Sequence, residues 1–232
     1  SSSGRGLWLI RPGEGLSRRI RRLLEAQESV VVQPWFERIL DFSLQYELSP
    51  TGKTRFLGLV HLHNDARGRF KGCSIEKDMI GKAAGDPERR LFYHPALQSL
   101  FQENLADHLG AALHRVGFSG PFGIDAMLIR NHADNPVCHP LVEINPRTTM
   151  GRVTLELHRH AQKGNRTEFR ILTDGEIKRQ GFASFAAFVE QQERLAPLEI
   201  GGSGRKPCLT GGFFPLNDPS MVQQFLPVAR FG

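Results

Sequence analysis

Residues 120–147 read GPFGIDAMLIRNHADNPVCHPLVEINPR, which is two apolar stretches with a polar cluster between them. The cluster NHADNP at 131–136 consists mostly of residues that favour turns, so we expect strands over 120–130 and 139–147 that form a hairpin. If the hairpin is symmetric about Asp134, Asp125 lies directly opposite Glu143. Opposed side chains of an antiparallel pair are about 4.5–5.5 Å apart at Cβ, and like charges there repel. The sequence therefore predicts two carboxylates held against each other.

A divalent cation would relieve this repulsion. Asn145 follows Glu143 by two residues, so the period of a strand places its amide oxygen on the same face. Three oxygen ligands around a negative centre suit a hard cation, Mg²⁺ above all. The alternative is a surface hairpin with one solvated acidic pair. A register slip of one residue would also remove the site.

Composition indicates a globular protein of one large domain or two small ones. The 232 residues are 40% hydrophobic and 23% charged, which argues against a disordered chain. No apolar run approaches the roughly 20 residues that span a bilayer. Cys73, Cys138 and Cys208 are odd in number and far apart, which argues against a disulfide framework and a Cys-x-x-Cys zinc site. We expect a cytoplasmic setting, and the net charge of +6 permits an anionic ligand.

Periodicity predicts a mixture of helices and strands. Apolar residues at helical spacing predict helices over 16–26, 95–116, 152–163 and 183–195. Besides the hairpin, we expect strands over 29–32, 41–47, 55–62, 169–172 and 209–214.

Three polar features have alternative interpretations. The loop SSSGRG at 1–6 has backbone N–H groups that could surround a phosphate, with Arg5 adding charge, or it is a flexible terminus. The arginines within 18–22 indicate a solvated helix face more than a nucleic-acid patch, since no aromatic residues alternate with them. His61 and His63 share a strand face, where a structural role is expected over metal binding.

Five segments in this order resemble the ATP-grasp superfamily, in particular its carboxylate–amine ligases. They are SSSGRG (1–6), VVVQPW (30–35), DFS (41–43), GIDAM (123–127) and EINPR (143–147), and the resemblance covers roughly residues 1–160. It implies an α+β fold, with a mostly antiparallel sheet and flanking helices. Residues 1–33 would be the remainder of a lid subdomain, 34–160 the carboxyl-terminal subdomain with the metal site, and 161–232 an extension packed on the same core.

The resemblance also implies nucleotide contacts. The lid over the phosphates would consist of Ser1, Ser2, Ser3, Gly4, Arg5 and Gly6. Main-chain groups of Gln33, Pro34 and Trp35 would meet the adenine edge. Asp41 would receive the ribose hydroxyls. Met127 would form the apolar floor under the adenine, with Leu141 opposite it.

The remaining implied roles belong to the hairpin. Asp125, Glu143 and Asn145 are similar to the family's Mg²⁺ ligands, and Arg147 resembles the cation that stabilises the transferred phosphoryl group or the tetrahedral intermediate. Lys71 could supply another phosphate cation, although an exposed lysine is the simpler interpretation.

The implied activity is an ATP-dependent, ADP-forming ligation of a carboxylate to an amine through an acyl phosphate. The partners would be ATP, Mg²⁺, an unidentified carboxylic acid and an amine; neither a membrane nor a nucleic acid is expected. The family's phosphate-gripping lysines precede the Ser/Gly loop, and its N-terminal subdomain is absent here. We therefore expect an incomplete and inactive fragment of such a ligase. The alternative is a non-catalytic nucleotide-binding or interaction module derived from such an enzyme.

Overall fold

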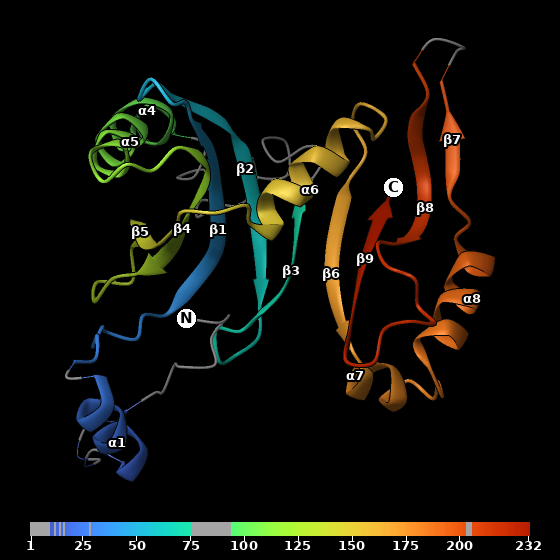
Figure 1. The fold of residues 1–232 in the computed structure, drawn as a ribbon, viewed down its shortest axis with the longest axis horizontal. Helices are drawn as coiled ribbons and strands as arrows, with labels where there is room; N and C mark the ends of the chain where they lie inside the picture. Colours follow the sequence, from blue (N-terminus) through green and yellow to red (C-terminus); the bar gives the residue numbers. More distant parts are fainter. Residues whose placement is uncertain are drawn as a thin grey trace.

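One antiparallel sheet organises the molecule. The computed structural model describes residues 10, 11, 13, 15, 17–27, 29–75, 94–202 and 206–232. Within them nine strands lie in the order β5-β4-β1-β2-β3-β6-β9-β8-β7, and every neighbouring pair is antiparallel (Figure 1). The α+β fold with a mostly antiparallel sheet is confirmed.

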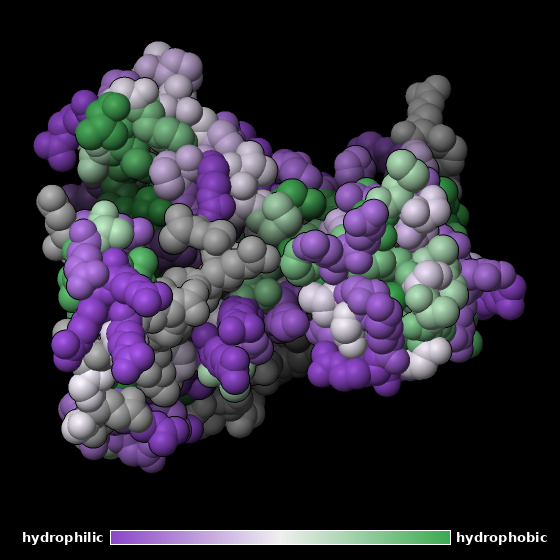
Figure 2. Space-filling view, turned by 60° about the horizontal axis from the view of Figure 1, so that its bottom comes forward, coloured by the Kyte–Doolittle hydropathy of each residue, from purple (hydrophilic) through white to green (hydrophobic). Residues whose placement is uncertain are grey.

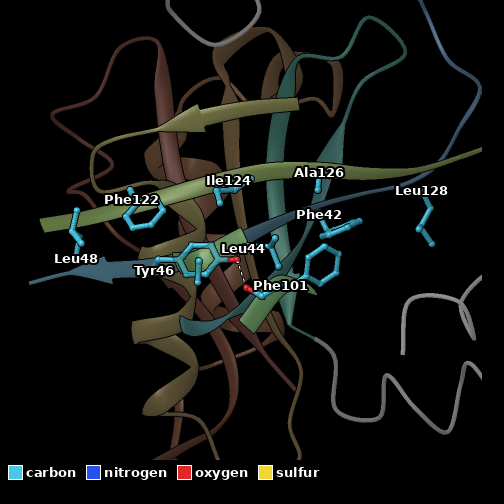
Figure 3. Close-up of a cluster of buried hydrophobic side chains, with 10 residues drawn as sticks. Phe42, Leu44, Tyr46, Leu48, Phe101, Phe122, Ile124, Ala126 and Leu128 are labelled. Carbon is cyan, nitrogen blue, oxygen red and sulfur yellow. Dashed lines mark hydrogen bonds between the residues drawn. The ribbon is translucent and has the colours of Figure 1, made fainter. Parts of the chain in front are cut away.

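The first half of the chain builds a core on one face of this sheet. It contains β1 (Arg38–Leu48), β2 (Thr54–Asn64), β3 (Phe70–Ile75), β4 (Gly120–Arg130) and β5 (Pro136–Asn145). Phe42, Leu44, Tyr46 and Leu48 alternate along β1 and are at most 1% exposed, as the period of two requires for one buried face, and they pack with residues of β4 (Figure 3). The Tyr46 hydroxyl donates to the Phe101 carbonyl at 2.7 Å, so the buried phenol is satisfied.

A helical segment covers this core, as the apolar spacing predicts. It consists of α4 (Pro95–Ser99), a π-helical turn η1 (Leu100–Asn104) and α5 (Leu105–Arg115). Pro95 stands in the first turn, where it has no N–H to lose, and Gly117 follows the end with φ of 80°. The π turn inside the segment has no signal in the sequence.

Helix α6 (Met150–Arg159) packs on the opposite face of the sheet. Leu155 joins Val60, Cys73 and Phe169 in a second buried cluster, which links β2, β3 and β6 (Thr167–Thr173). Thr149 caps this helix by accepting a hydrogen bond from the Arg152 N–H. The expected helix over 152–163 therefore begins and ends earlier.

The carboxyl-terminal part has a cluster of its own. Helices α7 (Asp174–Arg179) and α8 (Phe185–Leu195) cover β6, β8 (Cys208–Pro215) and β9 (Phe225–Phe231), while β7 (Glu199–Gly201) lies at the edge. Its buried side chains include Leu172, Phe188 and Phe213. β9 was not predicted because Pro227 lies within it.

Two lobes are visible in the space-filling view, with a narrower middle between them and hydrophilic residues over much of the surface seen (Figure 2). None of the described helices is long and apolar enough to cross a bilayer. The division at residues 33 and 160 stays a prediction.

The expected strand over 29–32 is wrong. Residues 29–37 belong to no strand of the described chain, although the Glu37 carbonyl accepts a hydrogen bond from the Arg130 N–H at 3.0 Å. They precede β1, and α1 (Arg18–Gln27) lies away from the sheet (Figure 1). Val31 is 87% exposed, so β-branched residues here have no sheet face to pack on.

Candidate metal site on the β4–β5 hairpin

The hairpin brings the two predicted carboxylates together. Asp125 of β4 lies directly opposite Glu143 of β5, and Asn145 lies opposite Gly123. Asp125 is partly buried and Glu143 is exposed, so the pair lies at the border between core and solvent. The predicted register at these positions is confirmed.

The register holds there although the hairpin is not symmetric about Asp134. Near the turn Arg130 pairs with Pro136, and an irregularity between Asp125 and Met127 gives β5 two additional residues. Met127 consequently lies opposite His139, and the expectation that Leu141 faces it is wrong. Leu141 is 38% exposed.

Burial and charge act on Asp125 in opposite directions. The pKa of this carboxyl is raised, first by burial and then also by the neighbouring charge of Glu143. The Ser43 hydroxyl, which donates to Oδ1 at 2.6 Å, lowers it, as do Asn145 and Arg147. A carboxylate that burial disfavours and a second carboxylate opposes would gain from a bound cation.

Asn145 is buried, and both ends of its amide have partners. Its Nδ2 donates to Asp125 Oδ2 at 3.2 Å, and its Oδ1 accepts from Arg147 Nη2 at 2.8 Å. The amide oxygen thus points to the guanidinium, the reverse of the orientation that we expect in a metal ligand. If Asn145 binds a cation, its amide turns over and releases Arg147.

The donor set fits a hard cation. Two carboxylates and an amide oxygen are the ligand types that Mg²⁺ takes, and this ion commonly keeps several waters. Among the residues that the structure describes, no group of three His, Cys, Asp or Glu side chains could hold a metal. A cation here would therefore depend on Asp125, Glu143, the amide of Asn145 and solvent or phosphate oxygens.

Asp41 lies on the same face of β1 as Ser43, and it is opposite Met127 across the β1–β4 pair. Its Oδ2 accepts from Arg38 Nη1 at 3.0 Å and from Asn64 Nδ2 at 2.9 Å. A ribose would compete with these two donors. The ribose-binding role of Asp41 stays a prediction.

The segment with the predicted adenine contacts runs beside the hairpin, because the ring of the neighbouring Phe36 lies 5.4 Å from the ring of His139 on β5, and its nucleotide role stays a prediction. Gln33, Pro34 and Trp35 are exposed, and the Arg38 guanidinium lies 5.3 Å from the centre of the Trp35 ring. Ser1 to Gly6 lie outside the described residues.

Lys71, the candidate phosphate cation, forms an ion pair with Glu176 at 3.1 Å. Its role as a phosphate cation stays a prediction. Arg18, Arg21 and Arg22 are exposed, as expected for a solvated helix face.

Three further residues form a line of hydrogen bonds that ends at Asp125, and they were not predicted. Ser43 contacts Asp125, Gln45 contacts Ser43, and Thr149 contacts Gln45. A signal for the first two existed, because polar residues alternate with apolar ones along residues 41–47 (DFSLQYE). Nothing in the sequence indicated Thr149.

Comparison with known proteins gives matches among solved structures alone. No protein-family model and no curated protein matches the sequence. The chain is similar to an N5-carboxyaminoimidazole synthetase from Staphylococcus aureus, with 12% identity and a TM-score of 0.43 over 85% of this chain and 47% of that chain. A biotin carboxylase from Campylobacter jejuni matches with 9% identity and a TM-score of 0.43 over 91% of this chain and 46% of that chain.

A third match is the biotin carboxylase domain of a 2-oxoglutarate carboxylase from Hydrogenobacter thermophilus, solved with MgADP, ADP and bicarbonate. It has 11% identity and a TM-score of 0.39 over 83% of this chain and 41% of that chain. The chain spans less than half the length of each of these three solved structures. Because the TM-scores are below 0.5, we draw no conclusion about chemistry from this likeness. The chemistry is argued from the residues of the hairpin.

Proposed function

We propose that the chain is part of an ATP-grasp carboxylate–amine ligase and that its β4–β5 hairpin holds the Mg²⁺ that accompanies the nucleotide. The observation that carries the proposal is the direct opposition of Asp125 and Glu143, with Asn145 beside them. Two carboxylates at one border of the core cost free energy unless a cation or proton neutralises them.

The reaction that this site would serve has two steps. An oxygen of the substrate carboxylate attacks the γ-phosphorus of ATP, the bond to the β,γ-bridging oxygen breaks, and ADP leaves. The amine nitrogen then attacks the acyl carbon, the bond to the phosphate oxygen breaks, and inorganic phosphate leaves while the amine loses a proton. Mg²⁺, when bound, would neutralise phosphate charge.

Arg147 would meet the charge that develops on the transferred phosphoryl group or the tetrahedral intermediate. Its guanidinium is already within hydrogen-bonding distance of Asn145, beside the carboxylates. A planar guanidinium can donate two parallel hydrogen bonds to phosphate oxygens. Release from Asn145 on cation binding would free a donor for this role.

The first experiment measures divalent-cation binding by the 232-residue chain. Mn²⁺ serves as the probe because electron paramagnetic resonance measures the concentration of free Mn²⁺. Glu143→Gln removes one charge and preserves the shape, and we expect affinity to fall by at least about tenfold, a loss of about 1.4 kcal/mol. Glu193→Gln, an exposed acid on α8, is the matched control and should bind as the wild type does. Equal affinity of Glu143→Gln and wild type would rule out the hairpin as the metal site.

A second experiment separates a ligase from a binding module. The chain, and any longer form of the protein in which it occurs, is screened for ADP formation that depends on both an acid and an amine. Turnover that Glu143→Gln abolishes supports the ligase. Nucleotide binding without any turnover supports the non-catalytic module.

A further inference from the structure

A line of hydrogen-bonded groups connects helix α6 to Asp125. The Arg152 N–H donates to Thr149 Oγ1 at 3.2 Å, and the Thr149 hydroxyl donates to Gln45 Oε1 at 2.6 Å. Gln45 Nε2 donates to Ser43 Oγ at 2.8 Å, and the Ser43 hydroxyl donates to Asp125 Oδ1 at 2.6 Å. Three side chains from β1 and the start of α6 thus lie between a helix N-terminus and the carboxylate.

The two ends determine the direction of every bond in this line. A backbone N–H can only donate and an ionised carboxylate can only accept, so each hydroxyl and amide between them directs its proton toward Asp125. Hydrogen bonds aligned in this way polarise one another. The bond to the ionised group is the strongest of them, since charge-assisted hydrogen bonds exceed neutral ones.

The Gln45 side chain is closely packed, and its two hydrogen bonds set which end of the amide faces Ser43. Ser43 and Gln45 are 2% and 1% exposed. A Cβ atom on Gly151 would lie 2.7 Å from Gln45 Nε2, and one on Gly123 would lie 3.3 Å from it. The amide therefore fits between two backbone segments that have no side chains at these points.

We propose that Thr149, Gln45 and Ser43 are positioning residues that hold Oδ1 of Asp125. Its Oδ2, which accepts from Asn145 Nδ2 at 3.2 Å here, would then bind a divalent cation once that amide turns over. This inference rests on the proposed function, because it assigns these residues to the metal site proposed there. It also couples that site to α6, since Thr149 caps the helix whose Arg152 side chain forms an ion pair with Glu47 of β1 at 2.9 Å.

The test compares Mn²⁺ binding by variants of the 232-residue chain. Ser43→Ala should weaken Mn²⁺ affinity by about 10–100-fold, the range for losing a group that orients a metal ligand. Gln45→Leu keeps the volume but removes both hydrogen bonds, so affinity should fall by less than in Ser43→Ala. Thr149→Ser keeps the hydroxyl and the cap and should retain wild-type affinity.

Ser74→Ala is the matched control. Ser74 is a fully buried serine on β3 whose hydroxyl contacts His63, so its loss should destabilise the fold without changing Mn²⁺ affinity. A measurement without metal accompanies it: the side-chain amide resonances of Gln45 in NMR spectra should shift in Ser43→Ala and stay in place in Ser74→Ala.

The outcomes separate the two proposals. If wild type and Ser43→Ala bind Mn²⁺ equally while Glu143→Gln binds weakly, the positioning role is wrong and the metal site stands. If wild type itself does not bind Mn²⁺, the metal site is wrong and the positioning role falls with it. If Ser74→Ala weakens binding as much as Ser43→Ala, the effect is one of general stability and the positioning role is again wrong.

Discussion

The ionised carboxylate of Asp125 lowers the stability of the folded protein. Burial and the Glu143 charge raise the pKa of its carboxyl, whereas Ser43, Asn145 and Arg147 lower it without cancelling the rise. Residues that bind a ligand often destabilise the unliganded protein, because the ligand offsets the loss of stability only when it is bound.

This cost predicts a pH-dependent difference in stability for Asp125→Asn. Because the native pKa is above the unfolded one, the native state binds more protons over the range between the two values, and wild-type stability falls as pH rises through that range. Asn has no charge to desolvate. The free energy of unfolding of Asp125→Asn should therefore increase relative to that of the wild type as the pH rises above the unfolded-state pKa of an Asp, about 4.

Urea unfolding at a series of pH values measures this difference. Adding MgCl₂ should stabilise the wild type more than the variant, because only a species that binds the native state shifts its stability. A difference between the two proteins that stays constant with pH would show that the carboxyl is not destabilised by burial.

Two helical glycines lie in opposite surroundings, one packed against a strand and one in open space. Gly110 is buried in α5, and a Cβ atom there would collide with the Thr54 side chain at the start of β2. Gly175 lies in α7, where a Cβ atom would meet nothing within 4 Å. The same substitution should therefore have opposite effects at the two sites.

We predict that Gly110→Ala destabilises the protein by about 1–3 kcal/mol, because overpacking against β2 outweighs the better helix propensity of Ala. Gly175→Ala should raise stability by up to about 1 kcal/mol. Chemical denaturation of both variants gives the two values. A stabilising Gly110→Ala would mean that α5 does not pack on β2 as closely as the structure shows.

The whole molecule has separate buried clusters along one continuous sheet. The cluster of β1, β4 and the helical segment over 95–115 shares no residue with the cluster of β6, β8, β9, α7 and α8. The pairing of β3 with β6 joins the two halves, together with the cluster around Val60 and Phe169. Local stability should therefore differ between the halves.

Hydrogen exchange of two matched variants tests this prediction. Phe188→Ala, which removes about 3–5 kcal/mol of packing, should accelerate exchange in β8 and β9 more than in β1 and β4. Phe122→Ala should give the reverse pattern. Equal acceleration throughout the sheet in both variants would show a single cooperative unit.

Local patterns in the sequence were sufficient for the opposition of Asp125 and Glu143 and for most helices and strands. Strand parity and a turn cluster act over a few residues, so they need no knowledge of the rest of the fold. The hairpin irregularity that places His139 opposite Met127 lay beyond this reasoning, because β-strand irregularities depend on what each strand packs against.

Tertiary structure alone decided what surrounds the carboxylates. Ser43 reaches Asp125 because β1 pairs with β4 across a long stretch of intervening chain, and Thr149 reaches Gln45 because α6 returns to the sheet. Arg147 donates to the amide oxygen of Asn145 and would compete with a cation for it. The spacing of residues in the sequence does not predict this contact. The sequence by itself determined which oxygen atoms share a strand face, since that depends on backbone geometry; the hydrogen-bond partners that orient them depend on contacts between distant segments.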